Sequence, residues 1–116
     1  NNLKFLEAFK TAYISLTNKE LEAHDFQKGD TEGLVNYGLS LKGARFAVIF
    51  IEHKEESIIK ISFRSKGDFD VNTFARTYFN GGGHKNAAGG RSKLNLEDTI
   101  AKFISILSEY KSELNS

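Results

Sequence analysis

The chain of 116 residues contains no cysteine, no methionine and no long hydrophobic run. Without cysteine it cannot form disulfides, thiolate nucleophiles or cysteine-based zinc sites, and its redox compartment stays undetermined. No apolar stretch approaches the ~20 residues of a membrane span, and the N-terminus lacks a signal-peptide pattern. We therefore expect a cytoplasmic protein with no membrane partner. Because there is no initiator methionine, we also expect the chain to be a segment of a longer protein.

The charge of the chain is balanced overall but unevenly distributed. Its composition of 40% hydrophobic and 27% charged residues is typical of one globular domain with its own core. The net charge is +1, yet residues 64–93 contain six basic and two acidic side chains, so this segment carries +4. The near balance argues against a general nucleic-acid coat, and the local excess favours one anionic ligand.

The basic segment surrounds a glycine-rich stretch at residues 80–91, Asn-Gly-Gly-Gly-His-Lys-Asn-Ala-Ala-Gly-Gly-Arg, which holds five of the ten glycines. Glycine loses much backbone entropy on folding, so such a run is a poor simple connector. Bare backbone lets an anion approach closely, and successive N–H groups can form a concave nest around it. His84 adds one directed hydrogen-bond donor or acceptor. The stretch therefore predicts an anion site, although tight turns or close packing are the commoner uses of glycine.

Hydrophobic periodicity predicts how the chain is organised. We expect strands at residues 9–16, 46–51, 59–63 and 87–91, and helices at residues 3–9, 18–24, 31–41, 71–78 and 95–114. Thr17 and Glu20 form a capping box, Asp30 or Thr31 is expected to cap the second helix, and Asp70 and Asn95 are expected to cap the later ones. The expected fold class is α/β, with α+β as the other option: a single mixed sheet of about four to five strands with helices packed on it.

Two polar side chains end the third expected strand and precede the glycine stretch. Arg64 offers a planar fork for phosphate and Ser65 offers a hydroxyl, so both are candidates to join the glycine stretch in one site. The ordinary alternative is a solvated strand end. His24, His53 and His84 are scattered and lack a neighbouring carboxylate at metal-ligand spacing, so we expect no metal site. The segment therefore looks able to bind a phosphate but not to attack one.

The glycine stretch also resembles a known family. Residues 81–89 fit the GGGHxxAAG signature of the DHHA1 domain, the C-terminal domain of DHH-family phosphoesterases. Residues 31–37 and 63–68 are similar to the branch that contains nanoRNase/pAp phosphatases and exopolyphosphatase-related proteins. The resemblance covers residues 9–110.

This resemblance implies that residues 1–116 are the substrate-binding domain of a longer phosphohydrolase. An N-terminal DHH domain of the same chain would hold manganese, and the substrates would be short oligonucleotides or pAp-type nucleotides. A homodimer is compatible with the resemblance. The residues that would contact the substrate are Asn36, Arg64, Ser65, Gly81, Gly82, Gly83 and His84. His84 would also stabilise the transition state.

The metal ligands of a DHH domain are absent from the sequence, so we expect this segment alone to be inactive. Three alternatives stay open. One is exopolyphosphatase-like activity of the full-length protein on polyphosphate. The second is an RNA-binding C-terminal domain of the alanyl-tRNA synthetase type, which an extended basic face would favour. The third is an interaction module in which the glycines serve packing only.

Overall fold

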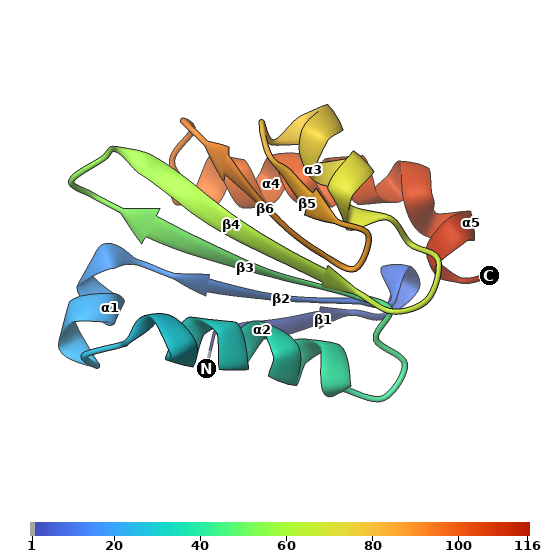
Figure 1. Ribbon diagram of the computed structural model, residues 1–116, viewed down its shortest axis with the longest axis horizontal. Helices are drawn as coiled ribbons and strands as arrows, with labels where there is room; N and C mark the ends of the chain where they lie inside the picture. The colour runs from blue at the N-terminus through green and yellow to red at the C-terminus, as the bar shows by residue number, and fades with distance from the viewer. Residues whose placement is uncertain (1) are drawn as a thin grey trace.

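A computed structural model describes residues 2–116 as one six-stranded mixed sheet in the order β1-β2-β3-β4-β6-β5 (Figure 1). Only β2 and β3 pair in parallel, and the other neighbours are antiparallel. The strands are β1 Leu3–Leu6, β2 Thr11–Leu16, β3 Phe46–His53, β4 Ile58–Ser65, β5 Gly82–His84 and β6 Ala87–Ser92. The helices are η1 Glu7–Phe9, α1 Asn18–Ala23, α2 Lys28–Ser40, α3 Val71–Tyr78, α4 Leu96–Leu107, η2 Ser108–Tyr110 and α5 Lys111–Leu114.

The expected α/β architecture with one mixed sheet is confirmed, with one strand more than the upper expected number. The strands foreseen from periodicity correspond to β2, β3, β4 and β6. The two further strands, β1 and β5, are short and lie at opposite edges of the sheet. Short edge strands carry little periodicity of their own, because their pairing partner decides their conformation.

The N-terminal segment is the clearest correction. The helix expected at residues 3–9 was wrong, because residues 3–6 form β1 and only Glu7–Phe9 make a single 3₁₀ turn. Leu3 pairs with Ile14 and Phe5 with Ala12 in β2, so both side chains add to the apolar cluster under α2. Pairing with β2 therefore outweighs the weak local preference for helix. Lys10, in a left-handed conformation at φ 51°, reverses the chain into β2.

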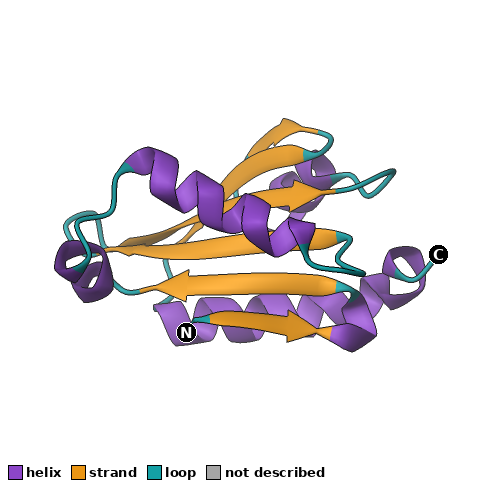
Figure 2. Cartoon of the chain, turned by 90° about the horizontal axis from the view of Figure 1, so that it is seen from below, coloured by secondary structure: helices purple, strands orange, loops and turns teal. Residues whose placement is uncertain are grey.

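Helices cover both faces of the sheet (Figure 2). On one face, α2 crosses β2 and β3 as part of the α1–α2 connection that joins these two parallel strands. The close approach depends on Gly38, where a Cβ would lie 3.4 Å from Ala12 Cβ and 3.7 Å from Ala47 Cβ. On the opposite face lie α3, α4 and α5 (Figure 1). Because α2 is a single helix, it leaves much of its own face of the sheet uncovered.

The capping predictions were right for three helices and wrong for α2. Thr17 and Glu20 make the expected capping box at α1, and Asp70 and Asn95 cap α3 and α4. Helix α2 instead begins earlier, after Gln27. Its N-terminus is closed by the Asp30 carboxylate, which accepts the Gln27 N–H at 2.9 Å.

The side of α2 that meets the sheet does not follow the helical spacing of the apolar residues Leu34, Tyr37 and Leu41. Val35 and Gly38 are its buried residues, whereas Tyr37 is 58% exposed. The two glycines at positions 33 and 38 weaken the periodic signal of this helix. The sheet therefore selects the face that permits the closest approach.

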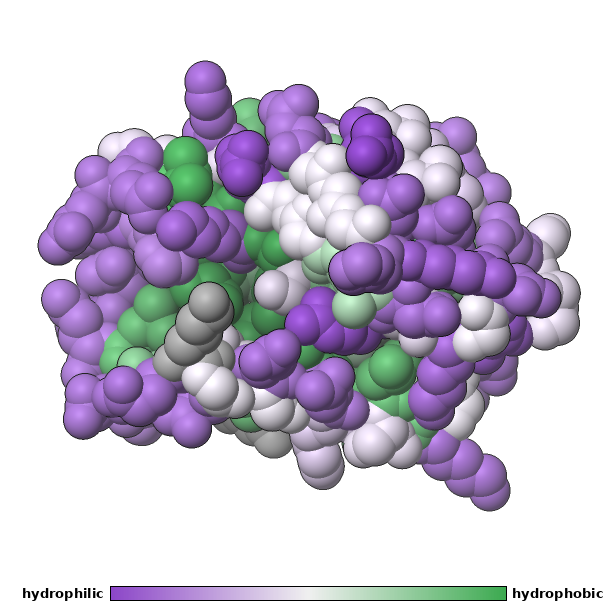
Figure 3. Space-filling view, in the orientation of Figure 1, coloured by the Kyte–Doolittle hydropathy of each residue, from purple (hydrophilic) through white to green (hydrophobic). Residues whose placement is uncertain are grey.

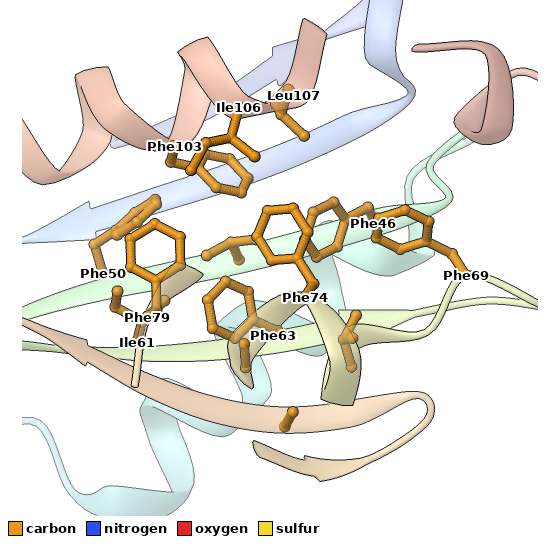
Figure 4. Close-up of a cluster of buried hydrophobic side chains, with 14 of the residues drawn as sticks. Phe46, Phe50, Ile61, Phe63, Phe69, Phe74, Phe79, Phe103, Ile106 and Leu107 are labelled. Atoms are coloured by element: carbon orange, nitrogen blue, oxygen red, sulfur yellow. The ribbon is translucent and has the colours of Figure 1, made fainter. Parts of the chain in front are cut away.

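Phenylalanine rings fill the core between the sheet and α3–α5 (Figure 4). Phe46 of β3 is fully buried at their centre. Its ring centroid lies 4.8–6.2 Å from those of four others, Phe63, Phe69, Phe74 and Phe103. Such packing fixes α3 on the sheet, and α3 in turn supports the glycine-rich segment. Within residues 2–116, no helix combines the length and apolarity needed to cross a bilayer.

Phe46→Ala is expected to destabilise the protein by about 3–5 kcal/mol, because it removes a buried ring and leaves a cavity among four others. Tyr37→Ala is the matched control, because it removes an exposed ring and should change stability by at most about 0.5 kcal/mol. Urea unfolding followed by circular dichroism measures both. Equal effects of the two variants would contradict the assignment of the core.

Candidate functional site

The glycine-rich stretch folds as a β-hairpin at one edge of the sheet. Strand β5 runs through two of its glycines to His84, the chain turns at Lys85 and Asn86, and β6 returns. In the pairing register Gly82 faces Gly89, Gly83 faces Ala88 and His84 faces Ala87. The expected strand at residues 87–91 is therefore confirmed.

Glycine is required here because the hairpin lies directly against its own backbone. A Cβ on Gly81 would overlap the Gly89 carbonyl oxygen, and a Cβ on Gly90 would lie 2.9 Å from both Cβ and O of Phe79. Gly82 and Gly83 also adopt φ values of 155° and 156°, which L side chains rarely occupy. The glycines thus serve close packing, whatever else they do.

The backbone N–H groups of this run do not form the concave nest that the sequence suggested, and that expectation was wrong. Gly81 donates its N–H to the Ala75 carbonyl at 3.2 Å, and Gly83 donates to Asn72 Oδ1 at 2.9 Å. The run is extended, and α3 takes up two of its donors. An anion bound at the hairpin must therefore be contacted mainly by side chains rather than by a ring of backbone amides.

Helix α3 is fixed at its start by Asp70, whose carboxylate accepts the Thr73 N–H at 3.1 Å. This hydrogen bond lowers the pKa of Asp70 from its ordinary value. Two residues further on, Asn72 Oδ1 accepts from both Gly83 N–H and Arg76 Nε. The capped helix thereby positions the start of β5.

Arg64 and His84 lie on the same rung across three neighbouring strands. Arg64 of β4 pairs with Ala87 of β6, and Ala87 pairs with His84 of β5. Directly paired residues point to the same face, so both side chains lie on the face that carries α2. Two strand spacings, ~10 Å, separate their backbones. The structure therefore brings these two expected site residues onto one face.

Two further rungs continue this open face along the strands. Ser62 pairs with Gly89, which pairs with Gly82, and Lys60 pairs with Arg91. A hollow of about 560 Å³ over β4, β6 and β5 is lined by Lys60, Ile61, Ser62, Asn80, Gly81, Gly82, Gly89, Gly90 and Arg91. We call the surface formed by Lys60, Ser62, Arg64, Gly82, His84, Ala87, Gly89 and Arg91 the open face.

The open face is bordered by α2. Arg64 Nη2 lies 3.5 Å from Glu32 Oε1, Arg64 Nη1 donates to the Phe63 carbonyl at 3.0 Å, and the Arg64 side chain is 18% exposed. Asn36, another expected site residue, is exposed and follows Glu32 by one turn of α2, so it lies above the same border. Figure 3 shows polar surface around an apolar hollow between α1, the start of α2 and the central strands.

Ser65 is placed differently from the other expected site residues. It is buried on the opposite face of β4, where its hydroxyl donates to the Phe69 carbonyl at 2.6 Å and accepts from Asn86 Nδ2 at 2.9 Å. Asn86 Nδ2 also donates to the Gly67 carbonyl at 3.1 Å. Ser65 thus ties the hairpin turn to the end of β4, and the structure does not bring it together with Arg64 and His84.

Sequence reasoning overlooked Lys60, Ser62 and Arg91 as site residues. The signal was available, because Lys60 and Ser62 alternate with the buried Ile59, Ile61 and Phe63 and therefore share the polar side of β4 with Arg64. What the sequence lacked was the register of β4 with β6, which places Arg91 beside Lys60.

Among the described residues, no three His, Cys, Asp or Glu side chains gather as metal ligands would. The side chains of the open face are cationic or neutral, with Glu32 at its border. This chemistry is suited to an anion rather than to a cation.

Gly81→Ala is expected to destabilise the protein by about 1–3 kcal/mol, because the new Cβ collides with backbone that cannot move without breaking the hairpin. Gly33→Ala is the matched control. A Cβ at Gly33 meets nothing within 4 Å, and alanine is the better helix former, so this variant should gain about 0.5–1 kcal/mol. Equilibrium unfolding measures both, and a tolerated Gly81→Ala would refute the packing role of the run.

Comparisons with known proteins identify the family and the fold. The chain matches the DHHA1 domain family over residues 9–113. It is similar to a solved exopolyphosphatase-related protein from Bacteroides fragilis, with 42% sequence identity and a TM-score of 0.92. That match covers 99% of this chain and 33% of the other, so the chain spans about a third of this relative's length. No functionally curated protein matches the chain significantly.

Two more distant structures share the fold alone. An uncharacterised protein from Helicobacter pylori has 20% identity and a TM-score of 0.55, with 91% of this chain and 27% of that one covered. A pGpG-specific phosphodiesterase from Vibrio cholerae has 12% identity and a TM-score of 0.60, with 95% and 35% covered. Because the family match extends over most of the sequence, this chain belongs to the DHHA1 domain family.

Proposed function

We propose that this domain holds the substrate phosphate of a DHH-family phosphohydrolase that cleaves short oligonucleotides or pAp-type nucleotides. The observation that carries the proposal is the rung Arg64–Ala87–His84, which places a guanidinium and an imidazole on one face beside a glycine floor. Family membership and the similarity to an exopolyphosphatase-related protein support phosphate chemistry. The DHH domain that completes the enzyme is part of the proposal.

The residues of the open face have distinct tasks in this proposal. Arg64 binds a terminal phosphate that does not react, because its guanidinium, held by the Phe63 carbonyl, offers a planar fork of donors that a phosphate can take over from Glu32. His84 is exposed at the edge strand and donates a hydrogen bond to the reacting phosphate as negative charge grows on its oxygens. Gly89 has no side chain, and a Cβ there would meet only the Ile61 carbonyl oxygen at 3.5 Å, so the substrate can lie against the sheet between these two groups.

The proposed enzyme depends on manganese, which would supply the activated water. The residues of this chain do not fit that metal, because the described part contains no cluster of three potential ligands. The ligands would belong to the DHH domain of the full-length protein. The role of this chain is then to bind and orient the substrate.

The similarity to an exopolyphosphatase-related protein favours one alternative substrate, linear polyphosphate. Its phosphates would meet the same cationic side chains. The tRNA-binding alternative would need a long basic surface, whereas the cations of the open face lie within three rungs of one sheet. Use of the glycines for packing alone is the remaining alternative, and their close contacts are compatible with it.

In the full-length protein, His84→Ala is expected to lower kcat on a short oligonucleotide by on the order of a hundredfold, because one preorganised donor is lost. Arg64→Ala should act mainly on KM, because a group that grips a non-reacting phosphate stabilises ground and transition states alike. Steady-state kinetics with manganese measures both. The isolated chain should release no product in the same assay.

The matched control is the loss of a cation outside the open face. Lys111→Ala removes an exposed cation of α5, on the opposite side of the sheet, and should leave both constants unchanged. Near-normal kcat of His84→Ala would make His84 a bystander and favour the packing-only alternative.

Glu32→Gln is expected to tighten phosphate binding to the chain by up to about fivefold, the usual worth of an exposed ion pair. The substitution frees the Arg64 guanidinium from its carboxylate partner at 3.5 Å. Isothermal titration with adenosine 5′-monophosphate measures the affinity, and Glu109→Gln, on η2 across the sheet, controls for net charge. Weaker binding of Glu32→Gln would show that Glu32 orients Arg64 rather than competing for it.

A further inference from the structure

The sheet contains two directly paired side chains of like charge, and the stability of the fold does not explain why they are there. Lys60 of β4 and Arg91 of β6 are directly paired across neighbouring antiparallel strands, and both point to the open face. Like charges in this position are unfavourable. Glu56 lies 3.1 Å from Lys60 Nζ, but in the described structure no ion pair or hydrogen bond joins the Arg91 side chain to another residue.

The position of this pair relative to Arg64 is fixed by the strand. Lys60 and Arg64 are four residues apart on β4, which corresponds to roughly 13 Å along the sheet. Ser62, Gly89 and Gly82 form the rung between them and bear only one short side chain. The hollow of about 560 Å³ extends from the rung of Lys60 and Arg91 to the rung of Ser62, Gly89 and Gly82. A chain-like anion that lies along β4 would therefore meet a cationic rung at each end of this interval.

We propose that Lys60 and Arg91 form a second anion subsite, which binds a phosphate of the same substrate that Arg64 and His84 hold. The inference rests on the proposed function, because it takes the Arg64 rung as the first phosphate site. The ligand class is an extended phosphate chain that spans both rungs, either a short oligonucleotide or a linear polyphosphate. A mononucleotide reaches only one rung. The like-charge pair thus selects substrates by length.

The experiment compares ligands of different length on the chain and its variants. The unmodified chain should bind 5′-phosphorylated triadenylate more tightly than adenosine 5′-monophosphate. Arg91→Gln and Lys60→Gln should each weaken triadenylate binding by roughly threefold to fivefold, the range for exposed ion pairs, and leave the monophosphate unchanged. The salt dependence of triadenylate binding should also fall by about 0.7 in logarithmic slope, the share of one phosphate on a single strand. Lys111→Gln is the control for net charge.

A second readout does not depend on any ligand. Because the pair is repulsive, Arg91→Gln should raise the midpoint of thermal unfolding of the free chain relative to Lys111→Gln. Long-chain polyphosphate, used as a third ligand, distinguishes the two candidate substrates. If Arg91→Gln weakens the binding of polyphosphate and of triadenylate equally, the subsite recognises phosphates alone. Tighter binding of triadenylate indicates an oligonucleotide.

Failure of this inference can be distinguished from failure of the proposed function. If the monophosphate binds normally and Arg91→Gln weakens triadenylate no more than Lys111→Gln does, the second subsite is refuted and the proposed function stands. If neither nucleotide binds the unmodified chain, the proposed function itself fails. A lower unfolding midpoint for Arg91→Gln would show that Arg91 is a structural residue, which also overturns the inference.

Discussion

The pairing register of β4, β6 and β5 is the constraint on which the rest of the site depends. Side chains alternate between the two faces of a strand, so one residue of slip would move Arg64 into the phenylalanine core and Phe63 onto the open face. The core prevents this, because Phe63 packs on Phe46, Phe74 and Phe79. The cost of burying a guanidinium thus fixes where the cations point.

The glycines of the hairpin permit this pairing register, because they allow the strands to approach closely. Gly81 lets β5 approach the return strand β6, Gly90 lets β6 lie against Phe79 and Phe63, and Gly83 donates its N–H to Asn72. On the open face, Gly89 leaves the surface of the sheet bare, whereas the side chains of Asn72 and Arg76 lie beside Gly82. One glycine-rich sequence therefore satisfies two demands, close packing toward the helices and open space toward the ligand. For this reason its composition alone cannot separate a packing role from a binding role.

Much of the fold could be predicted from the sequence, because long periodic segments and capping residues have local causes. Thr17, Asp70 and Asn95 each begin a helix as their side chains dictate. The edge strand β1 could not be predicted, since its conformation comes from pairing with β2. Similarly, Gln27 begins α2 with the help of Asp30, a reciprocal arrangement that few sequences signal.

The site could be predicted in part. Arg64, His84 and the glycines stand out by residue type, and the sheet places them on or beside one face. Ser65 stands out equally, but strand alternation turns it to the buried side. Lys60 and Arg91 are ordinary surface cations until the register makes them neighbours. What the sequence lacked was long-range pairing, which no local pattern encodes.

The central claim is that phosphate binds on the open face between Arg64 and His84. Its most direct measurement is a titration of the ¹⁵N-labelled chain with adenosine 5′-monophosphate, followed by amide chemical shifts. The account predicts saturable shifts that are largest at Arg64, Gly82, His84 and Gly89. Shifts centred on the apolar groove between β1 and α2, lined by Leu3, Leu34 and Tyr37, would contradict it, as would the absence of any saturable shift.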